Sequence, residues 1–231
     1  MRGRVALVTG AAGGIGSALV RELAGRGWRT AGLDLRPAQD AEHSVSVDVA
    51  ERAQVCAAVR RIERELGPVE AALCAAGHYA IVPVSDIAWP DWRRMLRVHL
   101  GGMVNVCAAV APGMADRGRG SLVAVASCLA IGGGNAEAHY AAANGALIGF
   151  VRSLAAELAP SGVRVNAVAP GPADTPMIPS DSPWRRPSFL QSLPAGRLTS
   201  PEEVALAAAY LVEDGTFCAG EILSPNGGTV I

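Results

Sequence analysis

Apolar residues follow two alternating patterns along the chain. Short continuous apolar runs, such as residues 5–8, are typical of strands buried on both faces of a sheet. Between these runs, apolar residues recur every three or four positions, as at Val55, Val59, Ile62 and Leu66, which predicts helices with one buried face. The predicted strands are residues 4–9, 29–34, 45–49, 69–75, 120–126, 163–168 and 221–223. The predicted helices are residues 14–26, 50–66, 90–114, 138–158 and 200–212.

This regular alternation of strand and helix predicts an α/β fold. The strands form a doubly wound parallel sheet flanked by helices on both faces, in a single domain that covers residues 1–231. One segment departs from the pattern. Residues 172–196 contain six prolines and no helical period, and we expect them to form a lid over a substrate site.

Composition narrows the functional classes. Half of the 231 residues are apolar and the net charge is −1, so nothing in the charge favours a nucleic acid or an anionic membrane as partner. The first predicted strand begins at residue 4, which leaves no room for a signal peptide and favours a cytoplasmic location. The five cysteines contain no Cys-x-x-Cys pair, so we expect buried free thiols with neither a metal nor a disulfide role.

A glycine-rich turn, residues 9–16, lies between the first predicted strand and the first predicted helix. Gly10, Gly14 and Gly16 allow the backbone to turn tightly and to approach a ligand closely. The N–H groups of the following helix turn can then bind a pyrophosphate. Asp34 ends the next strand, where a carboxylate can accept hydrogen bonds from ribose hydroxyls. The pattern favours dinucleotide binding over a merely flexible turn.

Three features together resemble the short-chain dehydrogenase/reductase family over nearly the whole chain. They are the glycine turn, a Ser127 placed thirteen residues before Tyr140, and the break at Pro170-Gly171. The resemblance implies a Rossmann-type fold, a nicotinamide cofactor, a small carbonyl or secondary alcohol substrate, and a homodimer or homotetramer. It implies cofactor contacts at Gly10, Gly13, Gly14, Ile15, Gly16, Asp34, Leu35, Asp48, Val49, Ala75, Ala76, Gly77, Tyr140, Asn144, Pro170, Gly171 and Thr175.

The charge near the ribose favours NAD over NADP. Asp34 would repel a 2′-phosphate at close range by about 1 to 4 kcal/mol, depending on the local dielectric constant. Gly13 supplies no compensating cation at a turn position where relatives that use NADP often carry a basic residue. Arg36 is the one local candidate for that role.

The expected catalytic residues depart from the family pattern at two positions. The resemblance makes Tyr140 the general acid/base and Ser127 the residue that orients the substrate oxygen. The family has a lysine four residues after the tyrosine, to lower the pKa of the phenol, but this chain has Asn144 there and no lysine anywhere. The family's asparagine in the preceding long helix is replaced by His99, which normally titrates near neutral pH. Either His99 and Asn144 form a rebuilt proton relay for Tyr140, or His99 is an interior histidine in a site that has lost catalysis.

Three functions are therefore compatible with the sequence. The first is an NAD-dependent oxidoreductase, the second an NAD-binding protein with little or no turnover, and the third an enzyme that transfers protons without net redox chemistry. In the expected lid, Trp184, Phe189 and Leu190 predict an apolar wall for the substrate. Arg185 and Arg186 either meet an anionic group or are simply solvated.

Overall fold

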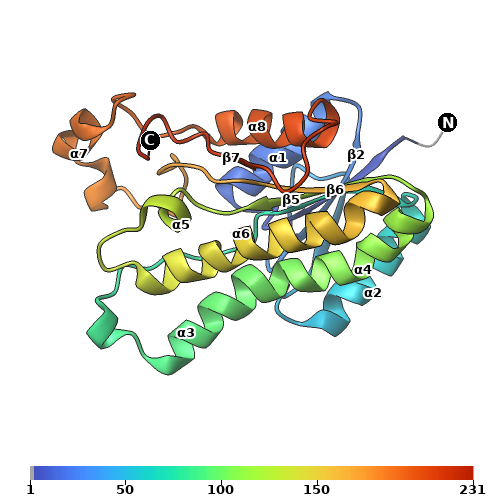
Figure 1. The fold of residues 1–231 in the computed structure, drawn as a ribbon, viewed down its shortest axis with the longest axis horizontal. Helices are drawn as coiled ribbons and strands as arrows, with labels where there is room; N and C mark the ends of the chain where they lie inside the picture. Colours follow the sequence, from blue (N-terminus) through green and yellow to red (C-terminus); the bar gives the residue numbers. More distant parts are fainter. Residues whose placement is uncertain (1–2, 231) are drawn as a thin grey trace.

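A seven-stranded, fully parallel sheet forms the centre of the computed structural model, which describes residues 3–230 (Figure 1). The strand order is β3-β2-β1-β4-β5-β6-β7. The strands are β1 (Val5–Thr9), β2 (Arg29–Asp34), β3 (His43–Ser46), β4 (Val69–Cys74), β5 (Gly120–Val125), β6 (Val163–Val168) and β7 (Ile222–Leu223). The order reverses between β1 and β4, and such a reversal opens a crevice at the carboxyl ends of the strands. The doubly wound parallel sheet predicted from the sequence is confirmed.

Helices cover both faces of this sheet (Figure 1). One face carries α1 (Gly14–Gly25) and α8 (Pro201–Glu213), and the other carries α2 (Arg52–Glu65), α4 (Gly102–Asp116) and α6 (Ala138–Leu158). Each face has its own apolar core, because the strands point alternate side chains to opposite sides. Leu19 and Leu211 are fully buried in the first core, and Val59 and Met114 are buried in the second.

The expected long helix at residues 90–114 is divided into three parts. It begins as α3 (Trp89–Leu96), passes through one π-helical segment, η2 (Arg97–Gly101), and continues as α4. π-helical segments occur frequently at functional sites, and this one carries His99. The stretch Trp89–Asp116 is long and apolar enough to cross a membrane by composition, but half of its apolar window is buried inside the protein, as in a core helix.

Several boundaries and short elements differ from the predictions. The third strand was expected at residues 45–49 but is His43–Ser46, because the chain turns away from the edge of the sheet after Val47 donates a last hydrogen bond to Asp34 O. The segment 172–196 is not wholly irregular. It contains a 3₁₀ turn, η4 (Pro183–Arg185), and the short helix α7 (Pro187–Ser192). The sequence pattern also missed η1 (Val84–Asp86), α5 (Leu129–Gly132) and η3 (Ala159–Ser161).

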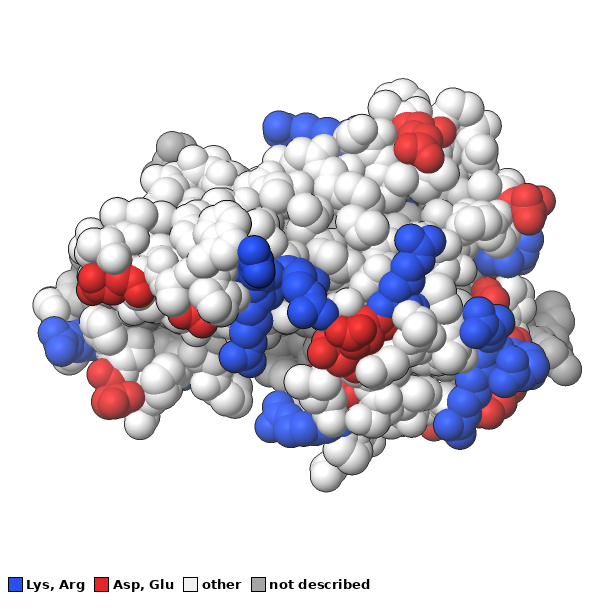
Figure 2. Space-filling view, turned by 90° about the horizontal axis from the view of Figure 1, so that it is seen from below, with Lys and Arg blue, Asp and Glu red and all other residues white. Residues whose placement is uncertain are grey.

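Charged side chains are distributed in mixed pairs. On the face in Figure 2, arginines lie beside carboxylates, with wide uncharged areas between them. Arg97 contacts Glu51 at 2.7 Å, and Arg21 contacts both Asp40 and Glu202 at 3.0 Å. Cys74, Cys107 and Cys128 are buried free thiols, whereas Cys56 and Cys218 are partly exposed, so the expected burial holds for three of the five.

Candidate active site

The glycine turn has the geometry that the sequence predicted. Gly10 has a φ of +66°, and a Cβ at this position would lie 2.7 Å from the carbonyl oxygen of Ala75 at the end of β4. A Cβ on Gly16 would overlap the carbonyl of Gly10. Neither position can therefore carry a side chain. Gly13 caps α1 without a side-chain hydrogen bond, so no side chain occupies the N–H groups of the first helical turn, as a phosphate site would require.

Asp34 lies beside this turn at the end of β2. One carboxylate oxygen accepts a hydrogen bond from the N–H of Ala12 (3.0 Å), and the other accepts one from the N–H of Arg36 (3.0 Å). These backbone donors hold the carboxylate in place at the edge of a cavity of about 550 Å³. The cavity is also lined by Gly10, Leu35, Asp48 and Val49, as expected for an adenosine site.

Three arginines that the sequence reasoning missed line the same cavity. They are Arg93 and Arg94 of α3 and Arg97 of η2. Arg36 is therefore not the only cation near the expected ribose position, and that part of the prediction is wrong. Arg97 is already paired with Glu51. Residues about 60 positions after Asp34 gave no local signal of this proximity, because only the tertiary structure brings α3 and η2 to the cavity that Asp34 lines.

A second cavity, of about 330 Å³, continues from the first. Both are lined by Ala76 and Gly77, which follow β4. The second cavity brings together all four expected catalytic residues and the remaining expected cofactor contacts: Ser127, Tyr140, His99, Asn144, Ile15, Ala75, Pro170, Gly171 and Thr175. Of the site residues expected from the sequence, only Gly13, Gly14 and Gly16 line neither cavity, and they belong to the turn itself. The described residues thus form one continuous crevice with a nucleotide end and a reaction end.

Tyr140 lies in the first turn of α6, between two aromatic rings. His99 meets it edge to face at a centroid distance of 5.5 Å, and Tyr79 does so at 5.0 Å. Burial raises the pKa of Tyr140 to about 12, although the Ser127 side chain and, more weakly, the Asn144 amide act to lower it. With no cation beside it, the phenol is protonated at neutral pH.

His99 is held by the backbone of His78. Its Nε2 lies 3.1 Å from the N–H of His78 and 2.9 Å from the carbonyl oxygen of the same residue. Burial lowers the pKa of His99 to about 4, so the imidazole is neutral at pH 7. The titration near neutral pH expected from the sequence is therefore wrong, because the π-helical segment buries the ring. A relay through His99 has to use the neutral ring as a donor and acceptor.

Asn144 is buried one helical turn after Tyr140. Its side-chain N–H donates to the backbone carbonyl oxygen of Tyr140 at 2.9 Å, so part of its hydrogen-bonding capacity is used within α6. His139, which directly precedes Tyr140, packs against Trp92 at a ring-centroid distance of 6.1 Å and does not line the cavity, because adjacent helix positions face about 100° apart.

A hydrogen-bonded chain of three side chains, absent from the sequence predictions, adjoins Tyr140. The indole N–H of Trp184 donates to the hydroxyl of Tyr79 at 2.8 Å, and that hydroxyl donates to Glu137. All three residues line the reaction end of the crevice. Glu137 stands three positions before Tyr140, and this helical spacing could have placed it near Tyr140 from the sequence. Its contact with Tyr79 spans 58 residues, and no local sequence pattern predicts it.

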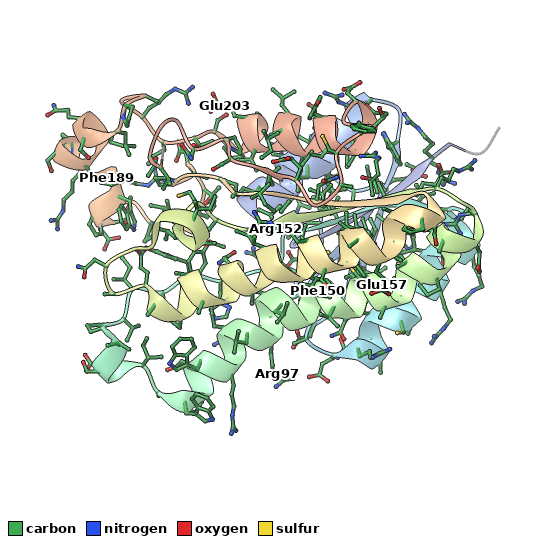
Figure 3. All side chains as sticks on the ribbon, viewed as in Figure 1. Arg97, Phe150, Arg152, Glu157, Phe189 and Glu203 are labelled. Carbon is green, nitrogen blue, oxygen red and sulfur yellow. The ribbon has the colours of Figure 1, made fainter. Side chains whose placement is uncertain are left out.

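The segment 172–196 covers the reaction end. Trp184 and Phe189 line the cavity and pack edge to face at 4.6 Å, but Leu190 does not line it, so the expected apolar wall is correct for two residues of three. Figure 3 labels Phe189 on α7, at one end of the molecule. Arg185 contacts Asp174 at 2.7 Å and donates to the carbonyl oxygen of Ile178 at 2.9 Å, so its charge is used within the segment.

Known proteins match this chain over nearly its whole length. A family model described as Enoyl-(Acyl carrier protein) reductase matches residues 10–230. Cis-4-hydroxycyclohexanecarboxylate dehydrogenase of Sinomonas cyclohexanicum is 37% identical over 97% of this chain and 96% of its own. The 3-oxoacyl-[acyl-carrier-protein] reductase FabG of Escherichia coli (strain K12) is 32% identical over 98% and 97%. The crystal structure of gox2181 superposes with a TM-score of 0.93 at 31% identity, covering 99% of this chain and 96% of that one.

The fold, the glycine turn and the paired Ser127 and Tyr140 agree with these matches. The family model covers far more than half of the chain, and the relatives exceed 30% identity. The chain therefore belongs to the short-chain dehydrogenase/reductase family of oxidoreductases.

Proposed function

We propose that this protein is an NAD-dependent oxidoreductase that exchanges hydride between nicotinamide and a carbonyl or secondary alcohol. The observation that carries the proposal is the placement of Ser127 and Tyr140 in one cavity that is continuous with the glycine turn and Asp34. The turn fits a dinucleotide because its glycines allow the tight backbone packing at Gly10 and Gly16, and because no side chain caps the N–H groups at the start of α1. When bound, the nicotinamide ring would supply the hydride chemistry.

The side chains of the protein provide position and proton transfer. Ser127 hydrogen-bonds the substrate oxygen, and the Tyr140 hydroxyl gives its proton to that oxygen during reduction or takes it during oxidation. Ala75–Gly77, Pro170, Gly171 and Thr175 shape the part of the crevice that receives the nicotinamide. The segment 172–196 acts as a lid that excludes water with Trp184 and Phe189.

Single-turnover absorbance at the band of the reduced nicotinamide tests this function. We expect a panel of ketones, mixed with the protein and stoichiometric NADH, to consume the band in proportion to the alcohol formed. Nucleotide binding without any change in the band would support an NAD-binding protein instead. Product without a change in the band would support proton transfer without redox chemistry.

The electrostatics around Tyr140 also support the second candidate function, an NAD-binding protein with little or no turnover. Tyr140 has a raised pKa, His99 is neutral at pH 7, and Asn144 supplies no cation, so no positively charged group among the described residues beside the phenol stabilises its ionised form. A phenol that ionises poorly makes a slow base. Low turnover with normal nucleotide affinity would fit this second reading.

The choice of NAD over NADP depends on Asp34. Its carboxylate is fixed by two backbone N–H groups and would repel a 2′-phosphate. We expect Asp34→Asn to raise the ratio of kcat/KM for NADPH to that for NADH by about tenfold or more. Asp48→Asn is the matched control, since Asp48 lines the same cavity, and it should leave this ratio unchanged. An Asp34 variant with an unaltered ratio would point to the arginines of α3 as the determinants.

We also propose a cytoplasmic homodimer or homotetramer built on α4 and α6. The outer face of α6 supports this, because Gly145 and Gly149 have open space where a side chain would be, which permits another helix to approach closely. Sedimentation velocity of the purified chain distinguishes a monomer from these assemblies.

A further inference from the structure

Glu137 is the one acidic side chain among the described residues that line the reaction end of the crevice. The residue has no exposed surface, although it stands at the start of α6, where a glutamate would normally be solvated. One carboxylate oxygen, Oε1, accepts the hydrogen bond from Tyr79. The other, Oε2, is buried and has no hydrogen-bond partner within the protein. A buried carboxylate with an oxygen left over is costly. Burial therefore raises the pKa of Glu137, while the hydrogen bond from Tyr79 acts to lower it.

The surroundings fix this carboxylate at the cavity. Tyr79 is itself held by the indole N–H of Trp184 at 2.8 Å, so the segments around residues 79, 137 and 184 are joined through the Tyr79 hydroxyl. Ala136, directly before Glu137, has a φ of +59°, which non-glycine residues rarely adopt. The carbonyl of Ala136 accepts a hydrogen bond from the N–H of Val82 at 2.7 Å, which helps to hold that backbone conformation. The position of the carboxylate is thus set by contacts on both sides.

No positive side chain balances this carboxylate within the cavity. The described lining residues include neither lysine nor arginine. His99, the histidine among them, is neutral at pH 7 because burial lowers its pKa to about 4. Arg185, in the nearby 172–196 segment, is committed to Asp174 and to backbone carbonyls. The rest of the lining is mainly apolar, with Leu129, Ile178 and Phe189 among its members.

We propose that Glu137 selects the substrate by charge: the reaction end takes small neutral or cationic carbonyl compounds and alcohols, and it rejects carboxylates. This inference rests on the proposed function for its meaning, since it names the class of substrate for that site. A cationic group of the substrate is attracted to the Glu137 carboxylate, whereas a carboxylate meets a like charge in a cavity with little water. The cavity, at about 330 Å³, lies at the small end of the range for small-molecule sites.

Binding of three ligands of one size tests the proposal without any turnover. Cyclohexylamine, cyclohexanol and cyclohexanecarboxylate share a ring and differ in the attached group, and none has a carbonyl to be reduced on the ring. At about pH 8, with excess NADH, we expect calorimetry to show cyclohexylamine bound at least about tenfold more tightly than cyclohexanecarboxylate, which corresponds to about 1.4 kcal/mol. Cyclohexanol should lie between the two.

Two variants distinguish the effect of the Glu137 charge from an effect on the local structure. Glu137→Gln keeps the shape and an acceptor for Tyr79 but removes the charge, and it should reduce the amine-to-carboxylate preference to about threefold or less. Tyr79→Phe removes the phenol hydroxyl and keeps the carboxylate, so it should retain the preference. Equal binding of the amine and the carboxylate by the unaltered protein, an unchanged preference in Glu137→Gln, or no binding of any ligand would each overturn the proposal. An absent hydride-transfer signal would count against the proposed function alone, because the ligands bind without reacting.

Discussion

Tyr140→Phe should reduce kcat by about 10²–10⁴-fold, the usual contribution of a positioned acid/base group. The substitution removes the hydroxyl and leaves the ring, so the edge-to-face contacts with His99 and Tyr79 persist and the start of α6 is unchanged. The loss therefore measures proton transfer and hydrogen bonding by the phenol, with little contribution from packing. Initial rates of ketone reduction, with NADH saturating, provide the measurement.

A second tyrosine in the same cavity serves as the control for that experiment. Tyr79→Phe removes a hydroxyl that contacts Glu137 and Trp184, and Tyr79 is not expected to transfer a proton to the substrate. Its effect on kcat with an unsubstituted ketone should be much smaller than that of Tyr140→Phe. Retention of a third or more of the activity by Tyr140→Phe would remove Tyr140 as the acid/base and would favour the alternatives without phenol chemistry.

Asn144→Lys should increase the rate of alcohol oxidation at pH 7 by about 10- to 1,000-fold. The unaltered phenol has a pKa of about 12, so only a small fraction of it is phenolate at neutral pH. An ammonium group one helical turn away favours the phenolate and typically lowers such a pKa by about one to three units. Each unit increases the phenolate fraction about tenfold as long as the pH stays below the pKa.

The pH dependence of the oxidation rate shows whether the lysine lowers the pKa of Tyr140. In oxidation Tyr140 must be deprotonated, so the rate of the unaltered protein should rise by about tenfold per pH unit between about pH 7 and pH 10, below its pKa of about 12. In Asn144→Lys the rise should end at a lower pH, because the pKa is lower. Asn144→Gln lengthens the side chain without adding charge and should leave the profile in place. A lysine variant that folds, as judged by its thermal transition, but shows the original profile would contradict this account of the site.

Much of the fold followed from local patterns. The strand and helix order, the glycine turn with Asp34, and the Ser127–Tyr140 spacing were all predicted, and the structure places them as expected around the crevice. The weakest predictions were those at edges and in short elements. The strand at His43–Ser46 was shifted and α5 was missed, because such elements depend on tertiary contacts more than on periodicity.

The chemical properties of the site were harder to predict from the sequence. His99 was expected to titrate near neutral pH because an isolated imidazole does, but burial in η2 lowers its pKa. The arginines of α3 beside Asp34 were not foreseen. The chain from Trp184 through Tyr79 to Glu137 joins residues separated by 105 and 58 positions. No local pattern contains such contacts.

The sequence alone determined the order of the longer strands and helices, where the backbone must be free of side chains, and which side chains were available for acid/base work. These properties depend on neighbouring residues and on the stereochemistry of each turn. Only the tertiary structure decided that the two cavities meet at Ala76 and Gly77 and that a buried glutamate lines the reaction end. It also decided that burial raises the pKa of Tyr140 to about 12 and lowers that of His99 to about 4. Desolvation and contact between distant segments determine these properties, and both arise only when the chain is packed in three dimensions.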